Sequence, residues 1–179
     1  SFERRGRYFT LQLFPFCRYN FLIMRIIGGK LKGRNIDVPA GYKARPTTDF
    51  AKEGLFNILN NEYEFEGLQV LDLFGGSGSI SYEFASRGAS MVYTVEMAPA
   101  TASFIRSQAA SLGLQNLTVV HHNVFDFLNL CREKFDLVFA DPPYFLSSGR
   151  KMDIAGRNVH FEKGAWDRSR STEEIDQFN

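Results

Sequence analysis

The stretch Val70-Leu-Asp-Leu-Phe-Gly-Gly-Ser-Gly-Ser79 decides the fold of this chain. The apolar run from Leu68 to Phe74 predicts a strand buried on both faces, because strands covered by helices lose polar alternation. Three glycines break this strand, and a helix is expected from Ile80 to Arg87, closed by Gly88. A strand, a glycine turn and a helix indicate the ligand-facing corner of a nucleotide-binding βαβ unit, although a simple tight turn is an open alternative.

The length and composition are those of one folded globular domain. The chain has 179 residues, 44% of them apolar and 23% charged, which argues against disorder. Cys17 and Cys131 match no metal-binding spacing and are expected to be reduced thiols. Residues 1–50 hold ten Lys/Arg and three Asp/Glu, whereas the remainder holds eleven and seventeen. A basic segment on an acidic body favours a polyanionic partner, with a solvated surface as the alternative.

The first 23 residues mix arginines with aromatic residues and show no clean periodicity. Arg18 interrupts the apolar part, so a signal peptide is not predicted, and the segment is too short and charged for a membrane span. We expect residues 1–23 to be an extension outside the fold. An aromatic RNA-stacking arm is the alternative.

A basic hairpin is predicted from Met24 to Val38, which contains turn glycines and alternating Lys/Arg. Arg45-Pro-Thr-Thr-Asp49 then forms a loop that enters a helix capped by Thr48 or Asp49. The apolar residues of this helix are expected in the core: Leu55, Phe56, Ile58 and Leu59. The cationic residues of the hairpin are candidates for phosphate contacts: Arg25, Lys30, Lys32 and Arg34.

Glu96 ends a second predicted strand, Ser90 to Glu96. An acid at this place can accept hydrogen bonds from both hydroxyls of a ribose, although strand-end acids also simply face water. A helix is predicted from Pro99 to Leu112, with further strands at Leu117 to His121 and Phe135 to Ala140 and a short helix between them. His121 and His122 are adjacent and point to opposite faces, which is poor spacing for a metal.

Asp141-Pro-Pro-Tyr144 directly follows the fourth predicted strand. The two prolines fix a rigid extended turn that offers a carboxylate and the Pro142 carbonyl as acceptors, with an aromatic ring beyond. This arrangement suits a planar amine, and an ordinary loop is the alternative. In a doubly wound parallel sheet, strands one and four are neighbours at the switch point, so the glycine turn and Asp141 should share one crevice.

Several segments together resemble the RsmD-type 16S rRNA guanine-N2 methyltransferases of bacteria, which are class I enzymes dependent on S-adenosylmethionine (AdoMet). The matching pieces occur in the family's order over residues 24 to about 146: Met24 to Arg34, Arg45 to Asp49, Leu55 to Asn57, Val70 to Gly78, Ser86 to Ala89, Val95-Glu96 and Asp141 to Tyr144.

The resemblance implies an α/β fold with a Rossmann-like, doubly wound, mostly parallel sheet and a small N-terminal β-hairpin. It implies AdoMet as cofactor without a metal, a 16S rRNA or small-subunit partner, and a cytoplasmic, monomeric enzyme without membrane contact. Expected cofactor contacts are Asp72, Phe74, Gly76, Ser77, Gly78, Glu96, Asn123, Val124 and Thr47. The expected catalytic residues are Asp141, Pro142, Pro143 and Tyr144, and Arg45 joins the hairpin cations as an RNA contact.

The chain departs from the family pattern at Gly75 and Ser81, where Ala and Gly are more common, and the pocket should tolerate both. The predicted organisation is an extension at 1–23, a hairpin and helix at 24–60, the AdoMet domain at 61–146 and an atypical tail at 147–179. The tail is polar, shows no strand-like run and matches no part of the family. A frameshifted or truncated reading frame would explain both ends, with C-terminal strands missing or replaced and the fourth strand left at a sheet edge.

The predicted reaction is transfer of the AdoMet methyl group to the exocyclic N2 of a guanine. Three alternatives stay open: an amino-methyltransferase acting on DNA adenine or cytosine or on protein glutamine, an NAD-dependent oxidoreductase, and a catalytically impaired RNA-binding remnant.

Overall fold

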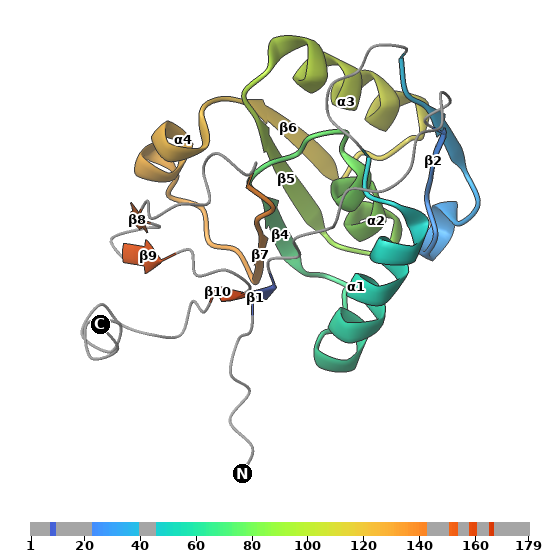
Figure 1. Ribbon diagram of the computed structural model, residues 1–179, viewed down its shortest axis with the longest axis horizontal. Coiled ribbons are helices and arrows are strands. Elements are labelled where there is room, and N and C mark those ends of the chain that lie inside the picture. The colour runs from blue at the N-terminus through green and yellow to red at the C-terminus, as the bar shows by residue number, and fades with distance from the viewer. Residues whose placement is uncertain are drawn as a thin grey trace.

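The computed structural model describes residues 8–9, 23–39, 46–142, 151–153, 158–160 and 165–166. Its centre is a four-stranded parallel sheet in the order β6-β5-β4-β7 (Figure 1). The strands are β4 (Gln69–Asp72), β5 (Met91–Glu96), β6 (Leu117–His121) and β7 (Leu137–Phe139). The predicted doubly wound order is confirmed, because the first and fourth of these strands are neighbours.

Helices cover both faces of this sheet. They are α2 (Ser79–Ser86), α3 (Pro99–Ser111) and α4 (Val124–Leu130) (Figure 1). Alternation along each strand divides the apolar residues into two clusters. Val70 packs with α2 and α3 residues, whereas Leu71 packs with Val124 and Leu128 of α4. The sheet is therefore buried on both sides, as its apolar strands predict.

The N-terminal hairpin pairs β2 (Ile23–Arg25) with β3 (Asn35–Asp37) in antiparallel register around the short 3-10 helix η1 (Gly29–Leu31). The helix α1 (Asp49–Glu62) follows. Of the two predicted caps, Thr48 is the one observed, because its hydroxyl oxygen accepts from the Ala51 N–H at 3.3 Å.

One side of α1 packs into the core through Leu55, Phe56 and Leu59. Phe56 makes edge-to-face contacts with Phe65 and Phe84, at ring-centroid distances of 5.7 and 4.9 Å. Ile58 was predicted in this core and is instead 42% exposed. The helical period places it off the buried stripe that Leu55 and Leu59 share.

The described parts of the tail contain short strands, although the tail sequence shows no strand-like run. Backbone pairing joins β8 (Lys151–Asp153) to β9 (Asn158–His160), and β10 (Ala165–Trp166) to β1 (Tyr8–Phe9) from the N-terminal extension. Strands of two or three residues are too short to display the alternation on which a sequence prediction depends. Among the described residues, no helix combines the length and the apolar composition of a membrane span.

Candidate active site

Three acids gather where the central strands end. Asp72 ends β4, Glu96 ends β5, and Asp141 lies two residues beyond β7. Burial is the main cause that raises the pKa of Asp72, to about 7. The negative charges of Asp141 and Glu96 also raise this pKa, whereas hydrogen bonds from the Ser81 hydroxyl and the Phe74 N–H lower it. Because β4 and β7 are parallel neighbours, Asp72 and Asp141 lie at the same edge of the sheet, and the shared crevice stays a prediction.

Asp72 is buried, and its side-chain hydrogen bond involves only one carboxylate oxygen. Its Oδ2 accepts from the Ser81 hydroxyl at 2.5 Å, and Ser81 Oγ accepts from the Thr94 hydroxyl at 2.6 Å. The other oxygen, Oδ1, is buried and forms no hydrogen bond within the described part of the chain. A buried acceptor left in this state is costly, and a donor supplied by a ligand would satisfy it.

The glycine turn between β4 and α2 is held from within and from β5. Gly76 and Gly78 have φ angles of +52° and +79°, which side chains disfavour. The Gly78 N–H donates to the Gly75 carbonyl at 2.7 Å, and the Gly75 N–H donates to the Val95 carbonyl at 3.0 Å. Ser77 is buried, with its hydroxyl 3.5 Å from the sulfur of Met24 in the hairpin.

Glu96 connects this turn to the end of β5. Its Oε2 accepts from the Gly76 N–H at 3.0 Å, and its Oε1 accepts from the Ala98 N–H at 2.7 Å. Each carboxylate oxygen can accept a second hydrogen bond. Glu96 is thus fixed in orientation by the backbone while both oxygens retain capacity for a diol.

Asn123 caps α4 after β6. Its Oδ1 accepts from the Phe125 N–H at 2.9 Å, and its Nδ2 lies 3.7 Å from the sulfur of Met97. Val124, the next expected cofactor contact, is 5% exposed. Met97 was not among the predicted cofactor contacts. It is 61% exposed. Its place directly after Glu96 in the sequence is the signal that could have indicated it.

Asp141 is exposed as a residue. The protein atoms around its carboxyl group nevertheless exclude part of the water, and this desolvation raises the pKa of Asp141 to about 6. Pro142, half-buried, follows it. Pro143, Tyr144 and Arg45 lie outside the described residues. Thr47 is half-buried one residue before the Thr48 cap, and Phe74 is half-buried at the start of the turn.

The described ranges contain no group of three His, Cys, Asp or Glu side chains arranged to hold a metal ion. His121 Nε2 lies 3.0 Å from the Met97 carbonyl oxygen, and His122 Nδ1 lies 3.2 Å from that of Asn123. The two histidines therefore contact backbone rather than each other.

The cations of the hairpin fall into two groups. Arg25 is paired with Asp49, whose Oδ2 lies 2.9 Å from Nε and 2.8 Å from a terminal guanidinium nitrogen. Lys30, Lys32 and Arg34 are exposed, and none of them forms an ion pair with another described residue. The second group has no ion partner among the described residues and can meet an external anion.

A buried ion network, which we call the hairpin seam, attaches the hairpin to α2. Glu83 is fully buried and accepts the Ile27 N–H at 2.7 Å and the Gly28 N–H at 3.2 Å. Lys52 lies 3.2 Å and Arg87 3.4 Å from its carboxylate. The Arg87 guanidinium also covers the Phe56 ring at 4.2 Å. The seam was not predicted, because its two backbone partners, Ile27 and Gly28, lie 56 and 55 residues from Glu83 in the sequence.

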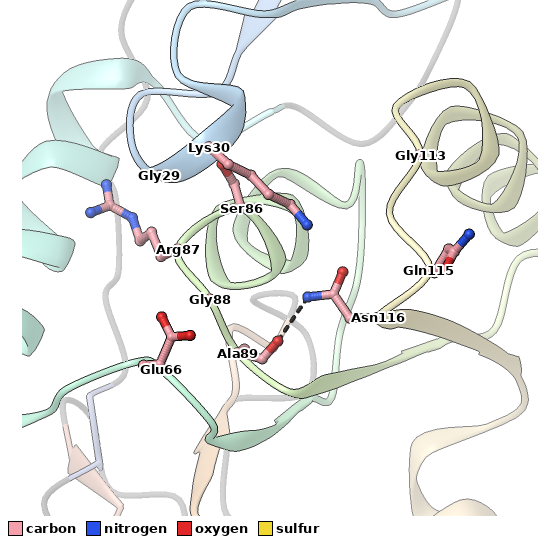
Figure 2. Close-up of a pocket in the computed structure, with 10 residues that line it drawn as sticks. All are labelled: Gly29, Lys30, Glu66, Ser86, Arg87, Gly88, Ala89, Gly113, Gln115 and Asn116. Carbon is pink, nitrogen blue, oxygen red and sulfur yellow. Dashed lines mark hydrogen bonds between the residues drawn. The ribbon is translucent and has the colours of Figure 1, made fainter.

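A pocket of about 580 Å³ opens at the opposite, amino edge of the sheet (Figure 2). Lys30 reaches over it from η1 toward Asn116, while Glu66 and Arg87 lie on the other side. Asn116 donates to the carbonyls of Ala85 at 3.1 Å and Ala89 at 2.7 Å, which ties the end of α2 to β6. The pocket is thus separated by the length of the strands from the acids at the carboxyl edge.

The parallel sheet with its reversed order, the glycine turn after β4 and the acid after β5 define a class I, Rossmann-like methyltransferase fold. The family model described as "Conserved hypothetical protein 95" matches residues 24–163. The chain belongs to this family, that of the RsmD-type methyltransferases. The match extends beyond residue 146, where the resemblance recognised in the sequence ends.

Similar proteins of known sequence have names that refer to methylation of ribosomal RNA. The chain is 38% identical over 121 residues to ribosomal RNA small subunit methyltransferase D of Escherichia coli K12, covering 68% of this chain and 60% of that protein. It is 35% identical over 125 residues to the rRNA methyltransferase YlbH of Bacillus subtilis, covering 68% and 67%. The chain thus spans about 60% of the length of the E. coli relative.

Solved structures agree. The E. coli chain described as methyltransferase yhhF shares 34% identity at a TM-score of 0.60, covering 70% of this chain and 67% of that one. A methylase of Haemophilus influenzae shares 32% identity at a TM-score of 0.55, with the same coverages.

Proposed function

We propose that this chain carries out AdoMet-dependent methyl transfer to the exocyclic N2 of a guanine in small-subunit ribosomal RNA. The observation that carries the proposal is the shared edge at which the glycine turn after β4, Glu96 at the end of β5 and Asp141 after β7 lie. One half of this edge suits a nucleoside-containing cofactor and the other suits an amine. The names of the relatives support methylation of ribosomal RNA.

The residues present fit AdoMet. The unpartnered Oδ1 of Asp72 is an acceptor for the ammonium of the methionine part, and the oriented Glu96 carboxylate is an acceptor for the ribose hydroxyls. The exposed thioether of Met97, held beside Asn123, offers an apolar surface for the adenine. Thr47, Phe74, Ser77 and Val124 complete the proposed pocket.

When bound, AdoMet supplies an electrophilic methyl group on a sulfonium. The amine of guanine is a weak nucleophile because its lone pair is delocalised into the ring. The Asp141 carboxylate and the Pro142 carbonyl would accept its two N–H groups, which favours a pyramidal nitrogen and directs the lone pair outward. Holding two reactants in this alignment can contribute about 7–11 kcal/mol at most.

Asp141 performs this task best when it is ionised, because a carboxylate is a stronger acceptor than a carboxylic acid. Its pKa of about 6 leaves the carboxylate predominant at neutral pH. Pro143 would keep the turn rigid, and Tyr144 would stack on the guanine after it leaves its helix or loop.

RNA would be held by the free cations of the hairpin, Lys30, Lys32 and Arg34, as phosphate contacts. Arg45 is proposed for the same role. Arg25 is a weaker candidate, because binding phosphate would require it to leave or share Asp49. The proposed partner is 16S rRNA, either free or within the small-subunit particle.

The test is the substitution Asp141→Ala. Methyl incorporation from labelled AdoMet into small subunits that lack the modification should fall by about 10³-fold or more, because amine alignment is lost. AdoMet affinity by calorimetry should stay within about twofold, since the proposed AdoMet contacts are unchanged.

Gln115→Ala, at the exposed amino edge, is the matched control and should leave both quantities unchanged. Retained turnover by Asp141→Ala would refute the role of this acid. Mass spectrometry of the methylated nucleoside distinguishes N2-methylguanosine from a methylated adenine or cytosine, which would instead support another amino-methyltransferase.

A further inference from the structure

Thr94 brings together the two positions at which the glycine turn and α2 depart from the family pattern. It is fully buried in β5, which pairs with strands on both sides. Its hydroxyl donates to Ser81 Oγ at 2.6 Å. Its methyl carbon Cγ2 lies against Gly75, where an added Cβ would stand only 2.3 Å away.

The direction of the hydroxyl chain follows from the number of protons. A hydroxyl group has one proton to donate. Ser81 directs its proton to Asp72 Oδ2, so its oxygen is free to accept the proton of Thr94. The chain Thr94 to Ser81 to Asp72 therefore delivers hydrogen-bond donors to the carboxylate and favours its ionised form.

The hydrogen-bonded series from Thr94 to Asp72 requires a residue without a side chain at position 75. A contact of 2.3 Å between carbon atoms is far inside van der Waals distance, and Thr94 cannot turn away without losing its bond to Ser81. Gly75 makes room for Thr94, Thr94 orients Ser81, and Ser81 holds Asp72. Thr94 thus links the two departures from the family pattern, Gly75 and Ser81.

We propose that Gly75, Ser81 and Thr94 act as one positioning unit, which holds Asp72 so that Oδ1 binds the ammonium group of AdoMet and thereby sets cofactor affinity. This inference rests on the proposed function for its ligand. The unit does not touch the reacting atoms, so its members are positioning residues.

The charges around Asp72 determine how the unit should respond to pH. Glu96 and Asp141 face it from the ends of β5 and β7, and both make its ionisation harder, while the Ser81 bond makes ionisation easier. An ammonium ligand prefers the carboxylate, so affinity should rise with pH through about 7. Loss of the Ser81 hydroxyl should move this midpoint upward by about one pH unit.

The experiment is calorimetric titration of the full chain with AdoMet and with S-adenosylhomocysteine, from about pH 5.5 to about pH 9. Ser81→Ala should weaken AdoMet binding about fivefold at pH 7 and hardly at all at the highest pH, because only the ionised fraction changes. Thr94→Val, which keeps the shape and loses the donor, should give a smaller shift of the same sign. Thr94→Ser, which keeps the donor, should match the unaltered chain.

A second measurement tests the steric part. Gly75→Ala should lower the thermal midpoint, and adding Thr94→Ser, which removes Cγ2, should restore most of it. A midpoint shift that is purely additive in the double variant would overturn the coupling even if Gly75→Ala binds no cofactor.

An identical pH dependence in Ser81→Ala and in the unaltered chain would overturn this inference alone, since AdoMet would still bind. Failure of the unaltered chain to bind AdoMet at any pH would overturn the proposed function, and this inference with it. The two failures are therefore distinguishable.

Discussion

The carboxyl edge of the sheet and the hairpin seam are both rich in charge, but they are built in opposite ways. At the carboxyl edge, Asp72, Glu96 and Asp141 are charges of one sign held near each other, and the pKa values of two of them are raised. In the seam, Glu83 is buried between Lys52 and Arg87 and accepts two backbone N–H groups. The edge holds charges of one sign close together, whereas the seam pairs charges of opposite sign.

This difference separates function from stability. Like charges in a low-dielectric site raise the free energy of the folded chain unless a ligand compensates them. A buried pair with complete hydrogen bonding is costly to break from one side. We therefore expect substitutions in the seam to affect unfolding and substitutions at the carboxyl edge to affect binding and turnover.

The largest effect is expected for Glu83→Ala. Lys52 and Arg87 would lose their buried counter-charge and two hairpin N–H groups would lose their acceptor, so the free energy of unfolding should fall by about 3–5 kcal/mol. Urea unfolding measures this change. Glu53→Ala, on the exposed side of α1, is the control and should change stability by less than about 0.5 kcal/mol. An equally small effect for Glu83→Ala would contradict the structural role of the seam.

The substitution Asp72→Asn is expected to increase the free energy of unfolding. The folded-state pKa of about 7 lies above the ordinary 3.8, so stability from this group is present below about pH 4 and is lost as pH rises through 7. A neutral amide removes that loss, which is worth as much as about 4 kcal/mol at pH 8. In urea unfolding, the free energy of unfolding of the variant relative to that of the unaltered chain should increase between about pH 5 and pH 8. AdoMet affinity should fall at least tenfold.

The pH profile of turnover tests Asp141. Because its pKa is raised to about 6, kcat/KM should fall about tenfold for each pH unit below that value. The measurement is initial rates at saturating AdoMet across the acidic range. A profile that stays flat to about pH 4 would indicate that the ionised Asp141 carboxylate is not required.

The smallest effect belongs to the free cations of the hairpin. Lys30→Ala combined with Lys32→Ala should weaken RNA binding by roughly tenfold and reduce its dependence on salt, because two phosphate contacts are lost. Calorimetric AdoMet affinity should not change. Lys134→Ala, an exposed lysine before β7, removes the same charge elsewhere and should leave RNA affinity unaltered. Equal losses from both sites would mean that only net charge matters.

Sequence reasoning was most successful where local pattern and topology coincide. The apolar run before Gly75 predicted β4, and the strand order placed β7 beside it. Ile58 was predicted wrongly and the short strands of the tail were not predicted, because a single helical turn or a two-residue strand has too little periodicity to decide. The roles of Asp72, Glu96, Asn123 and Asp141 in binding stay predictions.

The amino-acid sequence by itself determined the doubly wound sheet and the edge at which its site lies, because periodicity, glycine turns and connection rules act over short stretches of chain. Only the tertiary structure decided which side chains meet. Glu83 finds its hairpin partners 55 and 56 residues away, and Thr94 joins Gly75 and Ser81 across two elements. Such contacts depend on how helices and strands pack, and no local pattern in the chain records them.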